Sequence, residues 1–148
     1  MSFQFSLAAV LRYRESIEQR EYFALERTQQ EIVHTGARIR NVEQEYSTAL
    51  QNRAADLAKG VRAADVQSGY EYQTALEQQL EALRNSLQEL KIKWRQQMAS
   101  YAMARRNRET LERLREKQLD AYIREKAKRE QSMIDDLFLS RRGRGNGN

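Results

Sequence analysis

The spacing of apolar residues from Leu76 to Leu111 constrains the fold of this chain more than any other feature of its sequence. Two series of residues recur seven positions apart, with the second offset by four: Leu76, Leu83, Leu90, Ala104 and Leu111, and Leu80, Leu87, Trp94 and Tyr101. Gln97 is the polar member of the first series. Such a 4-3 repeat gives one apolar stripe on a left-handed coiled-coil helix. Because a single helix has no interior, this stripe must pack against a second helix.

The residues before this stripe predict that second helix. We expect it to run from about residue 3 to about residue 58, with Ser2 as its cap. Its stripe shifts by one position between Ala24 and Leu25, which changes the local supercoil without ending the helix. The stripe residues are Phe3, Leu7, Val10, Ile17 and Ala24, then Leu25, Ile32, Ile39 and Tyr46 interleaved with Thr28, Thr35, Val42 and Ala49.

A short turn between the two stripes predicts their arrangement. Gly60 suits the position that closes a helix, and Ser68 with Glu71 forms a capping box that opens the next one, with Asp65 as an alternative start. A turn over about 59–68 leaves room only for antiparallel neighbours. We therefore predict an all-α, elongated, antiparallel two-helix coiled-coil hairpin as one domain over 1–140, with a second helix over about 66–140. The tail 141–148 lacks apolar residues and is expected to be disordered.

The composition excludes several classes of function. Cysteine is absent and His34 is the only histidine, so we expect no disulfide, no metal site and no cofactor. Acidic neighbours such as Asp135 and Asp136 have no closed pocket in a two-helix hairpin, so we expect no enzyme activity. No apolar run is long enough to span a membrane and the start does not resemble a signal peptide, so a cytoplasmic protein is expected.

The net charge of +5 is unevenly distributed. Residues 101–148 contain thirteen basic and eight acidic side chains, whereas the rest of the chain is balanced. The last third would therefore attract an acidic partner, or it is simply a solvated basic helix. Acidic residues at intrahelical pairing distances from the arginines disfavour a nucleic-acid surface. Tyr46, Tyr70 and Tyr72 near the turn are consistent with either tip packing or docking, and Trp94 with either core packing or an exposed anchor.

Three segments, in this order, resemble the flagellar FliJ family of small coiled-coil proteins in the type III flagellar export apparatus. The first is the opening Phe3-Gln-Phe-Ser-Leu-Ala-Ala-Val-Leu-Arg-Tyr-Arg-Glu15. The second is Val42-Glu-Gln-Glu-Tyr46 before the turn, with Tyr72-Gln73 and Leu76 after it. The third is Glu112-Arg-Leu-Arg-Glu-Lys-Gln-Leu-Asp-Ala-Tyr122, followed by Arg129-Glu-Gln and Asp135-Asp-Leu. The resemblance extends over nearly the whole chain up to residue 140.

The resemblance implies a non-catalytic stalk that inserts into the hexameric ring of the flagellar export ATPase and promotes its activity. It also implies contacts with the cytosolic part of the export gate and with export chaperones, and membrane association only through this complex, at the cytoplasmic side of the inner membrane at the flagellar base. The implied ring-facing residues are Leu7, Leu11, Arg12, Arg14, Leu114, Lys117, Tyr122, Arg124 and Arg129. The implied gate-facing residues are Ile39, Val42, Tyr46, Tyr72, Ala75, Leu76 and Gln79. Family members often have larger apolar residues at the positions of Ala75 and Gln79.

Other functions are compatible with the same residues. The stalk of a virulence type III secretion system would share the hairpin and the ring mechanism. A nucleic-acid-binding rod would bind in a strongly salt-dependent manner, and a self-assembling scaffold would dimerise through uncovered stripe residues.

Overall fold

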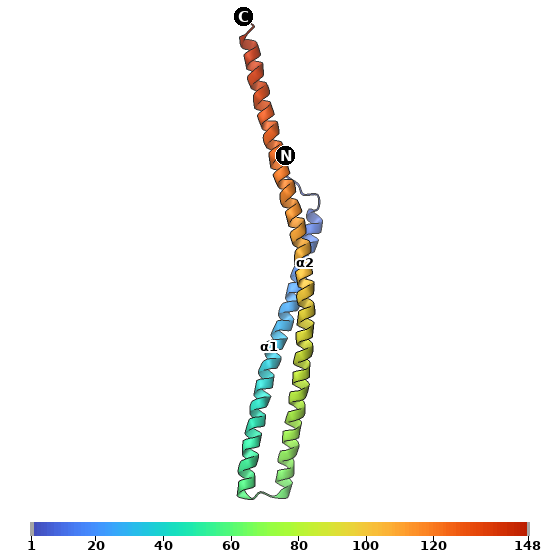
Figure 1. The fold of residues 1–148 in the computed structure, drawn as a ribbon, viewed down its shortest axis with the longest axis vertical. Helices are drawn as coiled ribbons and strands as arrows, with labels where there is room; N and C mark the ends of the chain where they lie inside the picture. Colours follow the sequence, from blue (N-terminus) through green and yellow to red (C-terminus); the bar gives the residue numbers. More distant parts are fainter. Residues whose placement is uncertain (1, 148) are drawn as a thin grey trace. The chain divides into compact units, whose positions relative to one another are not determined.

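The computed structural model describes residues 2–147, and these form an all-α hairpin of two antiparallel helices (Figure 1). Helix α1 runs over Ala8–Lys59 and helix α2 over Ala63–Gly145. No strand occurs in this part of the chain. The predicted fold class is therefore confirmed. Met1 and Asn148, the outer limits of the predicted hairpin and tail, lie outside the described residues.

The turn is much shorter than the predicted 59–68, because it contains only the three residues between α1 and α2. Gly60 has a φ of 74°, a left-handed conformation that glycine adopts without the steric cost of a Cβ atom. The carbonyl of Arg62 accepts hydrogen bonds from the amides of Asp65 (3.1 Å) and Val66 (3.2 Å) and so starts α2. Ser68 and Glu71 lie inside α2, so the predicted capping box does not open the helix.

The first residues are not helical, and α1 begins five residues later than predicted. Phe5 is buried, and the ring of Phe3 lies 5.6 Å from the ring of Tyr122 on α2. A helix that continued through these residues would gain one hydrogen bond per residue. The non-helical segment instead packs two aromatic side chains against the hairpin, and this packing is the larger gain. Ser2 is therefore not the helix cap.

The chain divides into two compact units, which we describe separately. The turn unit is Arg20–Ala102, and the terminal unit combines Met1–Gln19 with Met103–Asn148. The core of the turn unit consists of buried residues from both predicted stripes: Ile39, Val42, Leu76, Leu80 and Leu83. Tyr46, Ala49 and Leu87 pack against this cluster. The predicted seam is therefore confirmed in the turn unit.

The core of the terminal unit differs from the prediction on the α1 side. Leu11 is 7% exposed and packs in the core, whereas Val10, the predicted stripe residue, is 41% exposed. The half-buried residues Leu7, Arg14 and Glu18 have the same 4-3 spacing as Leu11. Continued through Glu21, this spacing reaches Leu25 without a shift, so the predicted shift at Ala24–Leu25 is wrong. Charged residues at seam positions concealed the continuous repeat.

Helix α2 continues through the predicted tail as far as Gly145, so a disordered segment from Arg141 is not observed. All residues over 126–147 are exposed, and no other described segment of the terminal unit covers them (Figure 1). The local sequence explains the continuation, because it contains no proline and its arginines are good helix formers. The end of α2 is thus a single helix without a partner.

Candidate partner-binding surfaces

The whole net charge of the chain lies in the terminal unit. This unit contains fifteen basic and ten acidic side chains, and the turn unit contains eleven of each. The sequence prediction placed the excess in the last third of the chain. The division into units adds the N-terminal residues, where Arg12 and Arg14 balance Glu15 and Glu18. An acidic partner would therefore be attracted to the terminal unit alone.

An ionic cluster on the seam joins the two helices of the terminal unit. The guanidinium of Arg108 donates two hydrogen bonds to the Glu18 carboxylate, one from Nε to Oε2 and one from Nη2 to Oε1 at 3.2 Å. Its Nη1 donates to Oε2 of Glu112 at 2.7 Å. The side chains of Arg108 and Glu18 are only 21% and 16% exposed. Two parallel bonds between a guanidinium and a carboxylate fix the relative orientation of the two side chains, and with it the register of α1 against α2 in this unit.

These carboxylates also act on the charge of the arginine. The hydrogen bond with Glu18, and then that with Glu112, raise the pKa of Arg108 above its ordinary value. Arg108 therefore stays protonated at every pH that a protein experiences. A raised pKa contributes stability that is lost only as the pH rises through it, so this contribution is present throughout the physiological range.

Sequence reasoning missed this cluster although its signal was present. Arg108 lies four residues after Ala104 and seven after Tyr101, which is a seam position on α2. Glu18 lies seven residues after Leu11, a seam position on α1. A search for opposite charges at seam positions, instead of apolar residues alone, would have paired them.

The structure divides the predicted ring-facing residues between the core and the surface of the terminal unit. Leu11 is buried and Leu7 and Arg14 are half-buried on the seam, so they hold the helices together. Tyr122 is half-buried against Phe3. The exposed members are Arg12, Leu114, Lys117, Arg124 and Arg129.

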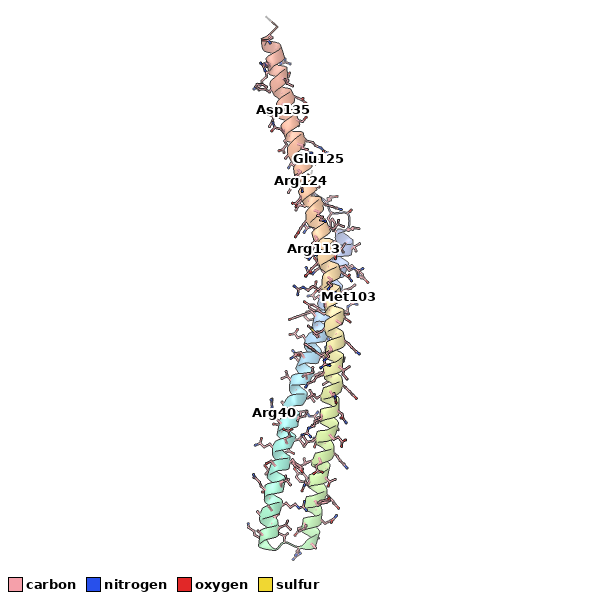
Figure 2. The ribbon with its side chains drawn as sticks, in the orientation of Figure 1. Arg40, Met103, Arg113, Arg124, Glu125 and Asp135 are labelled. Carbon is pink, nitrogen blue, oxygen red and sulfur yellow. The ribbon has the colours of Figure 1, made fainter. Side chains whose placement is uncertain are left out.

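Three of the exposed members share one face of α2. Lys117 follows Leu114 by three residues and precedes Arg124 by seven, which places their side chains along one side of the helix. Arg129 comes five residues after Arg124 and points to a different side, where its Nε lies 3.8 Å from Oε1 of Glu125. Figure 2 shows Arg124 and Glu125 on the part of α2 that continues beyond the N-terminal segment. The predicted ring-facing patch is thus one basic face with Leu114 on it, and Arg129 lies apart.

Three predicted gate-facing residues form the core of the turn unit and do not reach the surface. Ile39, Val42 and Leu76 all belong to the buried cluster. Their burial holds α1 against α2, so they cannot contact a partner while the hairpin is intact. Tyr46 is half-buried, donates a hydrogen bond from its hydroxyl to Glu77 (2.8 Å) and accepts one from Gln73 (3.3 Å).

The remaining gate-facing residues form an exposed strip on α2. Ala75 and Gln79 follow Tyr72 by three and seven residues, so the three side chains lie on one face. Tyr72 is 52% exposed and lines a hollow of about 150 Å³ near the turn, together with Leu57 and Val66. An exposed aromatic side chain beside a hollow is a suitable anchor for a protein partner.

Two aromatic residues whose roles the sequence left open have different positions in the turn unit. Trp94 is half-buried at its seam position, which favours core packing. Tyr70 is exposed, and the guanidinium carbon of Arg53 lies 5.1 Å from the centre of its ring. Arg53 also donates a hydrogen bond to Gln73 at 2.7 Å. The surface near the turn is therefore partly ordered by polar contacts.

Metal-binding and membrane-spanning features are both absent from residues 2–147. This range holds no group of three or more histidine, cysteine, aspartate or glutamate side chains placed to bind a metal ion. No helix within it has a stretch long and apolar enough to cross a membrane.

Two long antiparallel helices that pack against each other define the class of all-α coiled-coil hairpins, here with the whole net charge in one unit. Within that class, the family model described as "Flagellar FliJ protein" matches residues 3–147. The chain belongs to the FliJ family, which associates it with the flagellar protein-export apparatus. Neither the curated proteins nor the solved structures include a significant match to this chain.

Proposed function

We propose that this chain is the non-catalytic stalk of the flagellar export ATPase. In this role the terminal unit inserts into the hexameric ring and promotes ATP hydrolysis, and the turn unit contacts the cytosolic domain of the export gate. The transfer of export chaperones and the position at the cytoplasmic face of the inner membrane follow from the family resemblance alone. The ATPase itself would supply the phosphate-binding loop.

One observation carries the ring part of the proposal: the confinement of the whole net charge of +5 to the terminal unit. Exposed basic side chains form weak, screened contacts with acidic loops of a ring. Many such contacts steer association and allow exchange more readily than a single buried apolar interface. The exposed face with Leu114, Lys117 and Arg124 supplies contacts of this kind.

The test is ATP hydrolysis by the export ATPase of the same source, measured with and without this chain over a range of salt. We expect stimulation that weakens as salt increases and that is reduced in Lys117→Ala/Arg124→Ala, which removes the two exposed basic side chains of this face. The matched control is Arg38→Ala/Arg40→Ala, which removes two exposed arginines from the neutral turn unit (Figure 2 labels Arg40). Equal loss in both variants, or no stimulation by the wild-type chain at any salt concentration, would contradict the ring assignment.

The gate contact is tested separately. Tyr72→Ala removes the exposed aromatic side chain of the strip without touching the core, so affinity for the cytosolic domain of the gate should fall by about tenfold. Tyr13→Ala is the matched control, because Tyr13 is an exposed tyrosine of the terminal unit. If Tyr13→Ala weakens gate binding and Tyr72→Ala does not, the two surfaces have been assigned to the wrong partners.

A further inference from the structure

The last part of α2 carries an apolar face that the described chain leaves uncovered. Its members are Ile123, Met133, Ile134, Leu137 and Phe138, each more than half exposed. We call them the C-terminal apolar face. Met133 and Leu137 are four residues apart, as are Ile134 and Phe138, so they form a continuous strip. Exposed apolar strips of this kind mark interaction sites.

This face is not a continuation of the hairpin seam. The 4-3 spacing of the seam, continued from Tyr122, reaches Glu125, Arg129, Ser132 and Asp136, all of which are polar or charged. Each apolar member comes one or two residues after a seam position, which places it about 100° or 200° around the helix from the seam. A partner helix on the seam, as α1 is, would therefore leave it exposed.

The charges around the face indicate the chemistry of its partner. Residues 123–145 contain seven basic and four acidic side chains. Arg141 and Arg144 follow Leu137 by four and seven residues, so they extend the same side of the helix as the apolar strip. Asp135 and Asp136 flank Leu139 on the other side (Figure 2 labels Asp135). Lys126 lies on this side as well, so the apolar side holds three basic residues and one carboxylate, that of Glu130, seven residues before Leu137. The other acidic residues of the segment face away, and the apolar side keeps an excess of positive charge.

We propose that the C-terminal apolar face binds an anionic lipid bilayer. An amphipathic helix with apolar residues beside arginines lies in the interface of such a membrane, where the apolar side chains enter the acyl boundary and the arginines contact lipid phosphates. A second copy of this chain is a poorer occupant, because it would bring two segments with the same excess of positive charge together. The proposal concerns direct lipid contact by the chain outside the ATPase ring, because a helix end inside the ring could not lie on a bilayer. Its test involves neither the ATPase nor the gate.

The last part of α2 makes only local side-chain contacts, which also favours a lipid bilayer as its partner. Polar contacts between its side chains are local, as between Arg129 and Glu125 and between Gln131 and Asp135. Gly143 and Gly145 weaken the last turns, and a short helix without tertiary contacts is marginal in water. Burial of the apolar face in a bilayer would stabilise the helix where the rest of the molecule does not.

The experiment is cosedimentation of the full chain with vesicles, either phosphatidylcholine alone or an equimolar mixture with phosphatidylglycerol. We expect binding to the anionic vesicles only. Leu137→Ser/Phe138→Ser should reduce the partition coefficient by about tenfold or more. The matched control is Leu139→Ser, which removes an equally exposed leucine, at 62%, from the side of the two aspartates and should leave binding unchanged.

A second double variant measures the contribution of the arginines separately from that of the apolar side chains. Arg141→Gln/Arg144→Gln should weaken binding by about fivefold per arginine. Because all these residues are exposed, the helical content by circular dichroism should remain that of the wild type.

Equal binding to both kinds of vesicle, or full binding by Leu137→Ser/Phe138→Ser, would overturn the proposal. So would a dimer in lipid-free solution that Leu137→Ser/Phe138→Ser dissociates, since that result assigns the face to a second copy. Cosedimentation involves no ATPase, so failure of lipid binding would leave the stalk proposal intact.

Discussion

Gly36 lies inside α1, where glycine costs conformational entropy and offers no side chain. A Cβ atom at this position would meet nothing within 4 Å. We therefore predict that Gly36→Ala increases the free energy of unfolding by about 0.5–1 kcal/mol. Thermal unfolding followed by circular dichroism should show a rise in Tm of a few degrees, on the order of 2–4 °C.

Gly60 provides the opposing control at the turn. A Cβ atom there would also meet open space, but the φ of 74° is unfavourable for residues with a side chain. Gly60→Ala should therefore lower the free energy of unfolding by about 1 kcal/mol. A stabilised Gly60→Ala would show that the backbone conformation does not decide at the turn. A destabilised Gly36→Ala would contradict the open space around Gly36.

Arg108 and Glu18 permit a test of a charge pair at seam positions. Arg108→Ala leaves the 16% exposed Glu18 side chain without its main partner and removes packing from the seam. We expect the free energy of unfolding to fall by about 2–3 kcal/mol, near the lower end for buried pairs because water still reaches both groups.

The double replacement Glu18→Leu/Arg108→Leu should restore most of that stability, because a well-packed apolar pair avoids the desolvation of two charges. The measurement is a double-mutant cycle by chemical denaturation. If the double variant is no more stable than Arg108→Ala, the ionic cluster of Arg108 with Glu18 and Glu112 contributes net stability that two leucines cannot replace.

At the scale of the helices, the regular apolar spacing could be predicted from the sequence. The places where a tertiary contact replaces helix, or where a charge occupies the seam, could not. The seam from Leu76 to Leu111 follows from one repeat, because a coiled-coil helix has a single way to bury it. The departure of Phe3 and Phe5 from the helix depends on a tertiary contact with Tyr122, which no local pattern contains. Arg14 and Glu18 hid the repeat in α1 because charged residues at seam positions resemble a break until their partner is known.

The seam also permits a direct test of the turn unit. Leu83 is buried in the core and Leu87 packs against it, so Leu83→Asp and Leu87→Asp each place a charge among apolar side chains. We expect losses of about 3 kcal/mol or more in the free energy of unfolding, with the larger loss for Leu83→Asp.

The control for this test is Asn85→Asp, which adds the same charge at an exposed position between the two leucines. Its stability should remain within about 0.5 kcal/mol of the wild type. If circular dichroism and thermal unfolding show that Leu83→Asp behaves like Asn85→Asp, Leu83 does not face α1.

At the scale of the whole molecule, charge was the more predictable property of the candidate surfaces and burial the less predictable. The basic excess of residues 101–148 could be counted directly. Which residues of a patch face outward could not, because Ile39, Val42 and Leu76 match the family pattern and the seam equally well. Only the packing of α1 on α2 separates them from Tyr72, Ala75 and Gln79.

The uneven burial along α2 predicts uneven stability of its backbone. Residues 76–83 include three buried leucines, whereas all residues of 126–145 are exposed although they are helical. Local opening requires little free energy where a helix has no tertiary contacts. In native-state hydrogen exchange of the lipid-free chain, amides of 126–145 should therefore exchange at least about a hundredfold faster than those of 76–83. Equal protection of both segments in a monomer would contradict the uncovered helix end, because exposed backbone hydrogen bonds alone do not sustain such protection.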